Sequence, residues 1–174
     1  PEKRLLHTLG VRQTAVVLAG LYGARMQAAG VAAMLHDIAK PLSLPEMQKK
    51  AQEYDMRLPK DIYADENLLH GPLAAAIAEH ELGVTDAEIL SAISCHTTGK
   101  PDMSLQDKIL YLADMTSAER DWPGVDDLRA LEMQDLDRAL CDALKRSIDF
   151  VEEKGGSLDP ESVAAYEYAK AHLE

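Results

Sequence analysis

Hydrophobic positions recur every three or four residues along most of the chain, which is the period of an amphipathic helix. Residues 3–22 carry this pattern, and the apolar run over 24–40 predicts a second helix that Pro41 ends. Residues 43–46 (Ser-Leu-Pro-Glu) are typical of a capping box and predict a third helix to about Tyr54.

The pattern is lost from Asp55 to Leu69, where polar residues predict a loop over a functional site. After residues 68–72, an alanine-rich helix is predicted to end near Leu82, because Gly83 stands in the position of a C-cap. The helical period therefore resumes after an interruption of more than ten residues.

Further capping patterns divide the second half of the chain. Residues 85–88 (Thr-Asp-Ala-Glu) predict a capping box that opens a helix ending at His96, and Ser104 with Asp107 begins the next helix. Residues 109–113 are apolar on every face, which predicts a central buried helix. Amphipathic helices are predicted near 125–133, 135–153 and 160–173, the last capped by Asp159 before Pro160.

We therefore expect one all-α domain over residues 1–174, a bundle of about seven to nine helices. Its core should span residues 4–150, with a C-terminal helical extension over 151–174. Aromatic residues make up only 5% of the chain, which leaves little material for the strands of a β-sandwich.

Charge and cysteine content restrict the partners and the compartment. The formal net charge is −12 and no basic cluster offsets it, so contact with nucleic acid is not expected. A membrane span or signal peptide is not expected either, because no run of about 18 apolar residues or leader is found. Cys95 and Cys141 lack CxxC spacing, which favours free thiols and a reducing cytoplasm.

His36 and Asp37 lie side by side within an apolar run. Burying an imidazole and a carboxylate together is costly unless something pairs with both. Neighbouring helix residues point about 100° apart and can converge on one ion. The pair alone is a weak signal, and an ordinary helix end with His36 hydrogen-bonded in the core explains it better, so any metal site needs partners from elsewhere.

Four other polar side chains stand beside apolar runs or near helix ends: His7, His70, His96 and Asp114. Each alone has an ordinary explanation, such as a hydrogen-bonded histidine, a loop residue, a favourable helix dipole or an ion pair. Together with His36 and Asp37 they offer four histidines and two aspartates, which a metal could satisfy at once. His80 and His172 lie among charged neighbours and are read as surface residues.

The order of these residues resembles the HD-domain metal-dependent phosphohydrolases, which have a histidine, then a His-Asp pair, then a late aspartate. The matching residues are His7, His36, Asp37 and Asp114. His70 and His96 match the members of that family that are similar in holding two metal ions.

Longer matches extend the resemblance to the bacterial symmetrical bis(5′-nucleosyl)-tetraphosphatases over most of residues 4–150. They lie at residues 7–11, 35–40, 69–72, 96–101, 103–104 and 112–114. One departure follows Asp114, where that family usually has Ile-Glu-Pro before an arginine. This chain has Thr116, Ser117 and Ala118 before Glu119 and Arg120.

The resemblance implies that His7, His36, Asp37 and Asp114 hold one metal, that His70 and His96 hold a second, and that Asp37 bridges both. Imidazole and carboxylate ligands suit iron, manganese, cobalt or zinc, and the resemblance favours iron. Two such ions can activate a water for in-line attack at phosphorus. The residues implied as catalytic are Asp37, Lys40 and His70, and those implied to bind substrate phosphates are Lys40, Thr97, Thr98, Gly99, Lys100 and Arg120.

The implied reaction is symmetrical hydrolysis of diadenosine tetraphosphate to two ADP by a metal-activated water. One alternative is another HD-type phosphohydrolase, acting on deoxynucleotides or on nucleoside di- or triphosphates. The other is a non-catalytic helical binding module stabilised by metal. A homodimer is compatible with the sequence.

Overall fold

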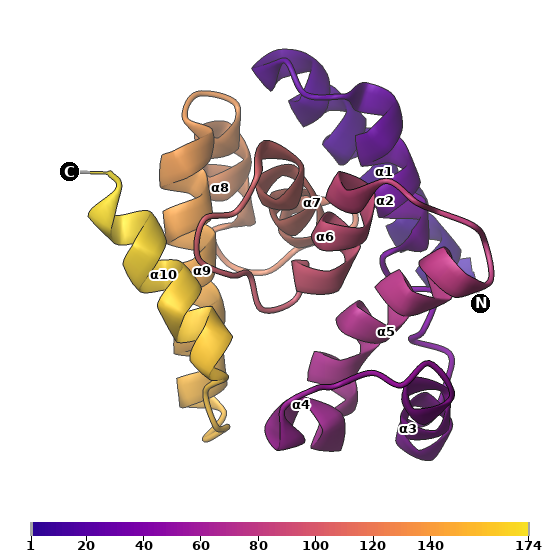
Figure 1. Ribbon diagram of the computed structural model, residues 1–174. Coiled ribbons are helices and arrows are strands. Elements are labelled where there is room, and N and C mark those ends of the chain that lie inside the picture. Colours follow the sequence, from indigo (N-terminus) through magenta and orange to yellow (C-terminus); the bar gives the residue numbers. More distant parts are fainter. Residues whose placement is uncertain (1, 174) are drawn as a thin grey trace.

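The computed structural model describes residues 2–173, and within that range the chain forms ten helices and no strand (Figure 1). The helices are α1 (Glu2–Tyr22), α2 (Met26–Leu35), α3 (Leu44–Glu53), α4 (Lys60–Ala64), α5 (Glu66–His80), α6 (Ala87–Cys95), α7 (Leu105–Thr116), α8 (Val125–Glu132), α9 (Leu136–Glu153) and α10 (Pro160–Ala171). The expected all-α fold is confirmed, although the number of helices exceeds the predicted range.

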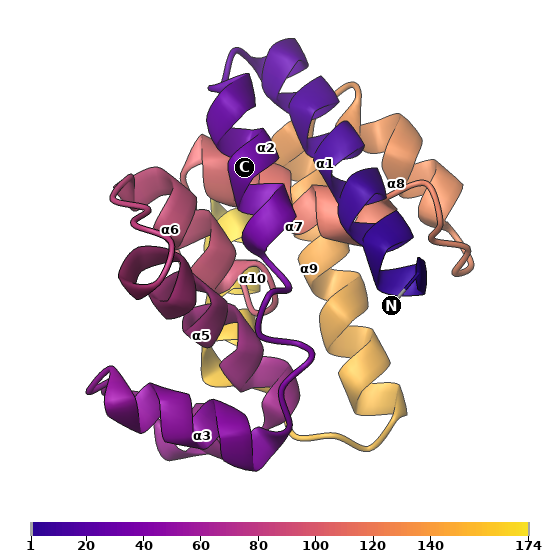
Figure 2. The same cartoon turned by 90° about the vertical axis from the view of Figure 1, so that its right-hand side faces the viewer.

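The first two helices form an antiparallel pair on one side of the molecule (Figure 2), and both also pack against α7. α2 ends at Leu35, so the prediction that this helix extends to residue 40 is wrong in its last turn. The chain continues in tight turns, in which the Lys40 amide donates to the Asp37 carbonyl at 3.0 Å. Pro41 prevents a helix from continuing beyond Lys40, because a proline disfavours the helical conformation of the residue before it.

The prediction of a loop from Asp55 to Leu69 is also wrong over much of its length. Residues 60–64 form α4, and α5 begins at Glu66 because the Asp65 side chain accepts a hydrogen bond from the Asn67 amide at 2.7 Å. Residues 71–72 (Gly-Pro) lie inside α5 rather than before it. The short helix α4, which was not predicted, accounts for part of the difference between the predicted and observed number of helices.

A glycine brings α5 and α6 close together. A Cβ atom added at Gly71 would lie 2.9 Å from the Ser94 carbonyl oxygen of α6, so any larger residue would push the two helices apart. α6 is capped by Asp86, which accepts from the Glu88 amide at 3.1 Å, and not by the predicted Thr85. The close approach places His70, the residue before Gly71, next to His96, which is the C-cap of α6.

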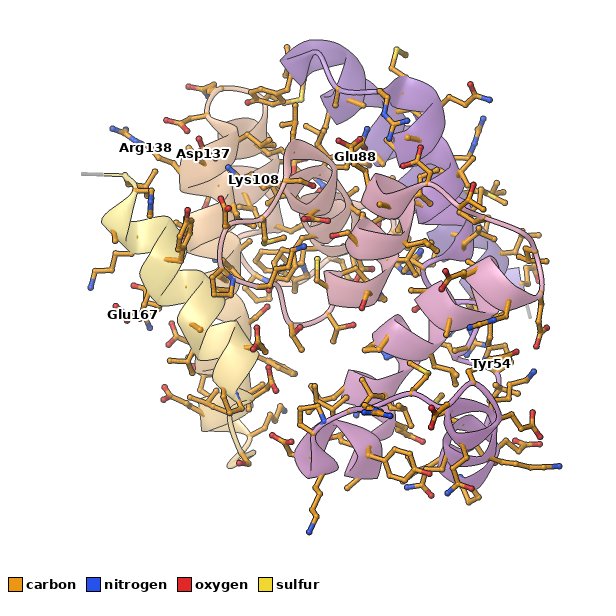
Figure 3. The ribbon with its side chains drawn as sticks, viewed as in Figure 1. Tyr54, Glu88, Lys108, Asp137, Arg138 and Glu167 are labelled. Atoms are coloured by element: carbon orange, nitrogen blue, oxygen red, sulfur yellow. The ribbon has the colours of Figure 1, made fainter. Side chains whose placement is uncertain are left out.

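The predicted buried helix is confirmed as α7, which packs against α1, α2, α6, α8 and α9. Its capping box is formed by Ser104 and Asp107, as the sequence predicts. α10 lies against α9, away from α1 and α5 (Figure 1). Lys108 of α7 and Asp137 of α9 form an ion pair of 2.5 Å between these two helices (Figure 3).

A buried carboxyl group joins α8 to the end of α7. Glu132 is 3% exposed, and burial raises its pKa to about 7 although its contact with Thr116 and the charge of Arg129 lower it. The Thr116 hydroxyl has a single hydrogen, yet it lies 2.8 Å from the Leu112 carbonyl and 2.9 Å from Glu132 Oε2. The Thr116 hydroxyl therefore donates to one of these two acceptors at a time, and its bond to Glu132 is the contact that lowers the pKa of this carboxyl group.

We expect Glu132→Gln to stabilise the protein more at high pH than at low pH. The folded pKa is about 7 against an ordinary value of 4.5, so unfolding releases a proton between these values and wild-type stability falls as the pH rises through them. The neutral amide avoids this loss, which is about 1–3 kcal/mol, or about 3–8 °C in Tm at about pH 8. Thermal melts at about pH 5 and pH 8 measure it. The exposed Glu153→Gln should change Tm little, and an equal gain for Glu132→Gln at both pH values would contradict the prediction.

Candidate metal centre

The structure brings together all six side chains that the sequence marks as metal ligands. They come from five parts of the chain: His7 from α1, His36 and Asp37 from the C-cap of α2 and the turn after it, His70 from α5, His96 from the C-cap of α6 and Asp114 from α7. His7 Nε2 lies 2.9 Å from Asp114 Oδ1, and His36 Nε2 lies 4.0 Å from the same oxygen.

Asp37 stands between two groups of ligands. Its Oδ1 atom lies 3.7 Å from His36 Nε2, 3.5 Å from His70 Nε2 and 3.8 Å from His96 Nε2. The donor atoms gather into one group of His7, His36 and Asp37 and a second group of Asp37, His70 and His96. A carboxylate shared by two groups can bridge two cations.

Backbone carbonyls hold three of the histidine rings in one orientation. His36 Nδ1 lies 2.7 Å from the Ala33 carbonyl, His96 Nδ1 lies 2.7 Å from the Ile93 carbonyl, and His70 Nδ1 lies 3.3 Å from the Glu66 carbonyl. Because a carbonyl only accepts, each Nδ1 carries the proton and donates it. In this orientation Nε2 of each ring faces Asp37, as in metal-bound histidines whose other ring nitrogen donates to a carbonyl.

The Nε2 atoms of these three histidines need a cation. His70 Nε2 and His96 Nε2 face each other at 3.0 Å, which places two acceptors in contact. His36 Nε2 is the one side-chain nitrogen or oxygen atom within residues 2–173 that is buried and has no hydrogen-bond partner. A buried polar atom without a partner is costly, and a metal ion on these nitrogens would remove the cost. The residues therefore fit a metal centre.

The histidine pKa values shift in opposite directions in the two ligand groups, down for His70 and His96 and up for His7. Burial lowers the pKa of His70 and of His96, so both rings stay neutral, which is the form that binds metal. The hydrogen bond to Asp114 raises the pKa of His7 against the effect of burial. Burial alone would raise the pKa of Asp114, but the bond to His7 and the nearby charges lower it overall, which keeps the carboxylate ionised.

Three of the predicted substrate-binding residues lie at this cluster. The Thr97 hydroxyl oxygen is 3.2 Å from His70 Nε2 and 3.3 Å from His96 Nε2. The positive charge of Lys40 lies near enough to contribute to the lowered pKa of His70. Arg120 donates to the Asp114 Oδ1 atom at 2.7 Å.

The structure engages the other three predicted substrate-binding residues elsewhere. The Thr98 hydroxyl donates to the Gly99 carbonyl, and Gly99 adopts φ of +68° against side chains of α9 and α10. Lys100 donates to Ser91 at 2.7 Å and pairs with the buried Asp107 at 3.2 Å. Their contact with substrate stays a prediction.

Sequence reasoning missed Glu119, which accepts a hydrogen bond from His7 Nδ1. Glu119 lies in the turn after α7, whose shape depends on Arg129. This arginine donates to the carbonyls of Thr116, Ser117 and Arg120 at 2.9, 2.9 and 2.8 Å. Glu119 and His7 are 112 positions apart, and the sequence has no periodic signal that relates them.

Comparison with known proteins agrees with this arrangement. The model of the HD domain family matches residues 4–119. The chain is 41% identical over 165 residues to the symmetrical bis(5′-nucleosyl)-tetraphosphatase of Halalkalibacterium halodurans, covering 95% of this chain and 88% of that protein. It is 38% identical over 170 residues to the Bacillus subtilis protein of the same name, covering 96% and 89%.

A solved structure shows the same fold. A crystal structure from Clostridium acetobutylicum, described as a predicted HD superfamily hydrolase involved in NAD metabolism, superposes with a TM-score of 0.95 at 37% identity. The match covers 99% of this chain and 91% of that one. The fold, the family match and the His and Asp cluster of this chain thus define a helical, metal-dependent hydrolase. The chain belongs to the HD domain family, and its relatives over nearly the whole length include symmetrical tetraphosphatases. Within residues 2–173, the structure has no helix with the length and apolar character needed to cross a membrane.

Proposed function

We propose that the protein hydrolyses dinucleoside tetraphosphates symmetrically, converting diadenosine tetraphosphate into two ADP. The observation that carries this proposal is the pair of ligand groups that share Asp37. Two ions held in this way can act together on one phosphate, so no nucleophile from the protein is needed. The names of the relatives from Halalkalibacterium halodurans and Bacillus subtilis supply the substrate class.

In this proposal His7, His36, Asp37 and Asp114 hold one ion, and His70 and His96 hold the second with Asp37 between them. The bound ions supply Lewis acidity and an activated water. The protein keeps His70 and His96 neutral by burial and fixes their rings through the backbone carbonyls of Glu66 and Ile93.

Two cations of the protein flank the proposed centre. Lys40 lies near His70, in the group of the second ion, and Arg120 contacts Asp114, in the group of the first. Positive charges beside both ions suit a polyphosphate that extends in both directions from the attacked phosphorus. The Thr97 hydroxyl, close to both His70 and His96, is placed to donate a hydrogen bond to a bound oxygen. Lys100 is a weaker candidate because its charge is already paired with Asp107.

Iron is the metal that we propose for both positions, and metal analysis of the purified protein tests it against manganese, cobalt and zinc. The net charge of −12 supports the proposal that nucleic acid is not a partner. The homodimer, the cytoplasmic location and the single domain over residues 1–174 stay predictions from the sequence.

The decisive experiment is product analysis with diadenosine tetraphosphate and the metal-loaded protein in ¹⁸O-labelled water. ADP should be the sole product, and half of it should carry the label on its terminal phosphate, because each cleavage adds one water oxygen to one of the two halves. Formation of AMP and ATP would contradict symmetrical attack. Faster cleavage of a deoxynucleotide or of a nucleoside di- or triphosphate would instead support a different HD-type phosphohydrolase.

A further inference from the structure

His7 is oriented differently from the other three histidines of the centre. Their Nδ1 atoms face backbone carbonyls, whereas His7 Nδ1 donates to the carboxylate of Glu119. The opposite ring nitrogen, His7 Nε2, then points at Asp114 Oδ1 at 2.9 Å. A carboxylate behind a histidine fixes its tautomer and raises its basicity as a ligand, which a carbonyl does less strongly.

Glu119 is itself held in place from two sides. The buried Ser117 hydroxyl donates to Glu119 Oε1 at 2.6 Å, which fixes the carboxylate in the turn after α7. On the side of α1, the carboxylate occupies the space above Gly10, because a Cβ atom added there would overlap Glu119 Oε2. Gly10 lies one turn after His7, so the same face of α1 supplies the ring and the space for its partner.

The Glu119 carboxylate accepts hydrogen bonds from two donors, the Ser117 hydroxyl and His7 Nδ1, which is the role of an ionised side chain. A negative charge on the far side of the His7 ring increases the attraction of that ring for a cation at Nε2.

We propose that Glu119, fixed by Ser117 and accommodated by Gly10, is a positioning residue that orients His7 toward the first metal ion. The inference rests on the metal centre of the proposed function and adds a residue to it that is not itself a ligand. Ser117 lies within the stretch Thr116 to Ala118, where the sequence departs from the Ile-Glu-Pro pattern, and Glu119 follows that stretch directly.

The test measures how firmly the full-length protein holds cobalt. Wild-type protein and variants are loaded with Co²⁺, dialysed against graded chelator, and assayed for metal per chain. Glu119→Ala should release the first ion at about 10–100-fold lower chelator concentration than wild type, while the second ion is released as in wild type. Glu119→Gln keeps the size of the side chain and should show an intermediate loss. Asp121→Asn, which removes an exposed carboxylate two positions away, should behave like wild type.

Gly10→Ala separates positioning from general destabilisation. In wild-type protein the added methyl group should displace the Glu119 carboxylate and weaken the first ion as Glu119→Ala does. In the Glu119→Ala background the space is free, so the same change should cause no further loss. Additive losses, or unchanged cobalt retention in both Glu119 variants while wild type holds two ions, would overturn the proposal. Fewer than two ions in wild type would instead contradict the proposed metal centre.

Discussion

Asp37→Ala is expected to lose both metal ions and to lower kcat by about 10⁴-fold or more. Asp37 Oδ1 lies within 3.8 Å of the Nε2 atoms of His36, His70 and His96, so its removal takes a ligand from both groups at once. Each ion contributes several kcal/mol to the stabilisation of a phosphoryl transition state, and about 1.36 kcal/mol corresponds to a tenfold change in rate. Metal content per chain and kcat with diadenosine tetraphosphate measure the two effects.

The matched comparison is His36→Ala, which removes a ligand from the first group alone. We expect this variant to keep the second ion and therefore to hold more metal than Asp37→Ala. His80→Ala, on the exposed end of α5 where the ring stacks on Tyr54, should keep both ions and full activity. Equal metal retention in Asp37→Ala and His36→Ala would rule out the bridging role of Asp37.

Three of the predicted helix caps are confirmed, whereas the cap of α6 is Asp86 and not the predicted Thr85. The capping boxes at Ser43 and Ser104 and the cap at Asp159 all form as expected, because the partner of each cap lies within three residues. The prediction from sequence failed at residues 71–72, where Gly and Pro usually indicate a break in a helix but lie inside α5. The tight contact of α5 with the Ser94 carbonyl outweighs those signals, and a long-range contact of this kind has no pattern in a single sequence.

The candidate site could be predicted as a set of residue types but not as a geometry. The six proposed ligands are costly to bury singly, so the sequence indicated that they belong together, and the structure gathers five of them in two groups with Asp114 beside His7 and His36. Of the predicted substrate-binding residues that follow His96 in the sequence, Thr97 lies at the cluster, whereas the next three make other contacts. Gly99 in the left-handed region turns the chain after His96, and Lys100 then pairs with Asp107. Glu119 was missed because its only relation to His7 is three-dimensional.

The alternative of a non-catalytic, metal-stabilised module is separated from a hydrolase by the stability of the metal-free protein. In a structural site the ion holds the fold, so the metal-free chain would unfold. Here the hydrophobic core runs from Val11 to Ala165 through residues of α1, α5, α7, α9 and α10, and none of the six proposed ligands belongs to it. We therefore expect the metal-free wild type to melt cooperatively.

His70→Ala is expected to lower kcat by about 10³-fold or more while the fold is kept. The ring is 2% exposed, and burial holds it neutral, so its Nε2 lone pair is available for the second ion. Without metal, that lone pair faces the lone pair of His96 at 3.0 Å, which is unfavourable. Removing the ring should therefore cost the metal-free protein little, even though a small cavity is left. Thermal melts with and without chelator, together with kcat, test this. A metal-free His70→Ala variant that is unfolded while the metal-free wild type is folded would show that His70 serves the fold rather than the second ion.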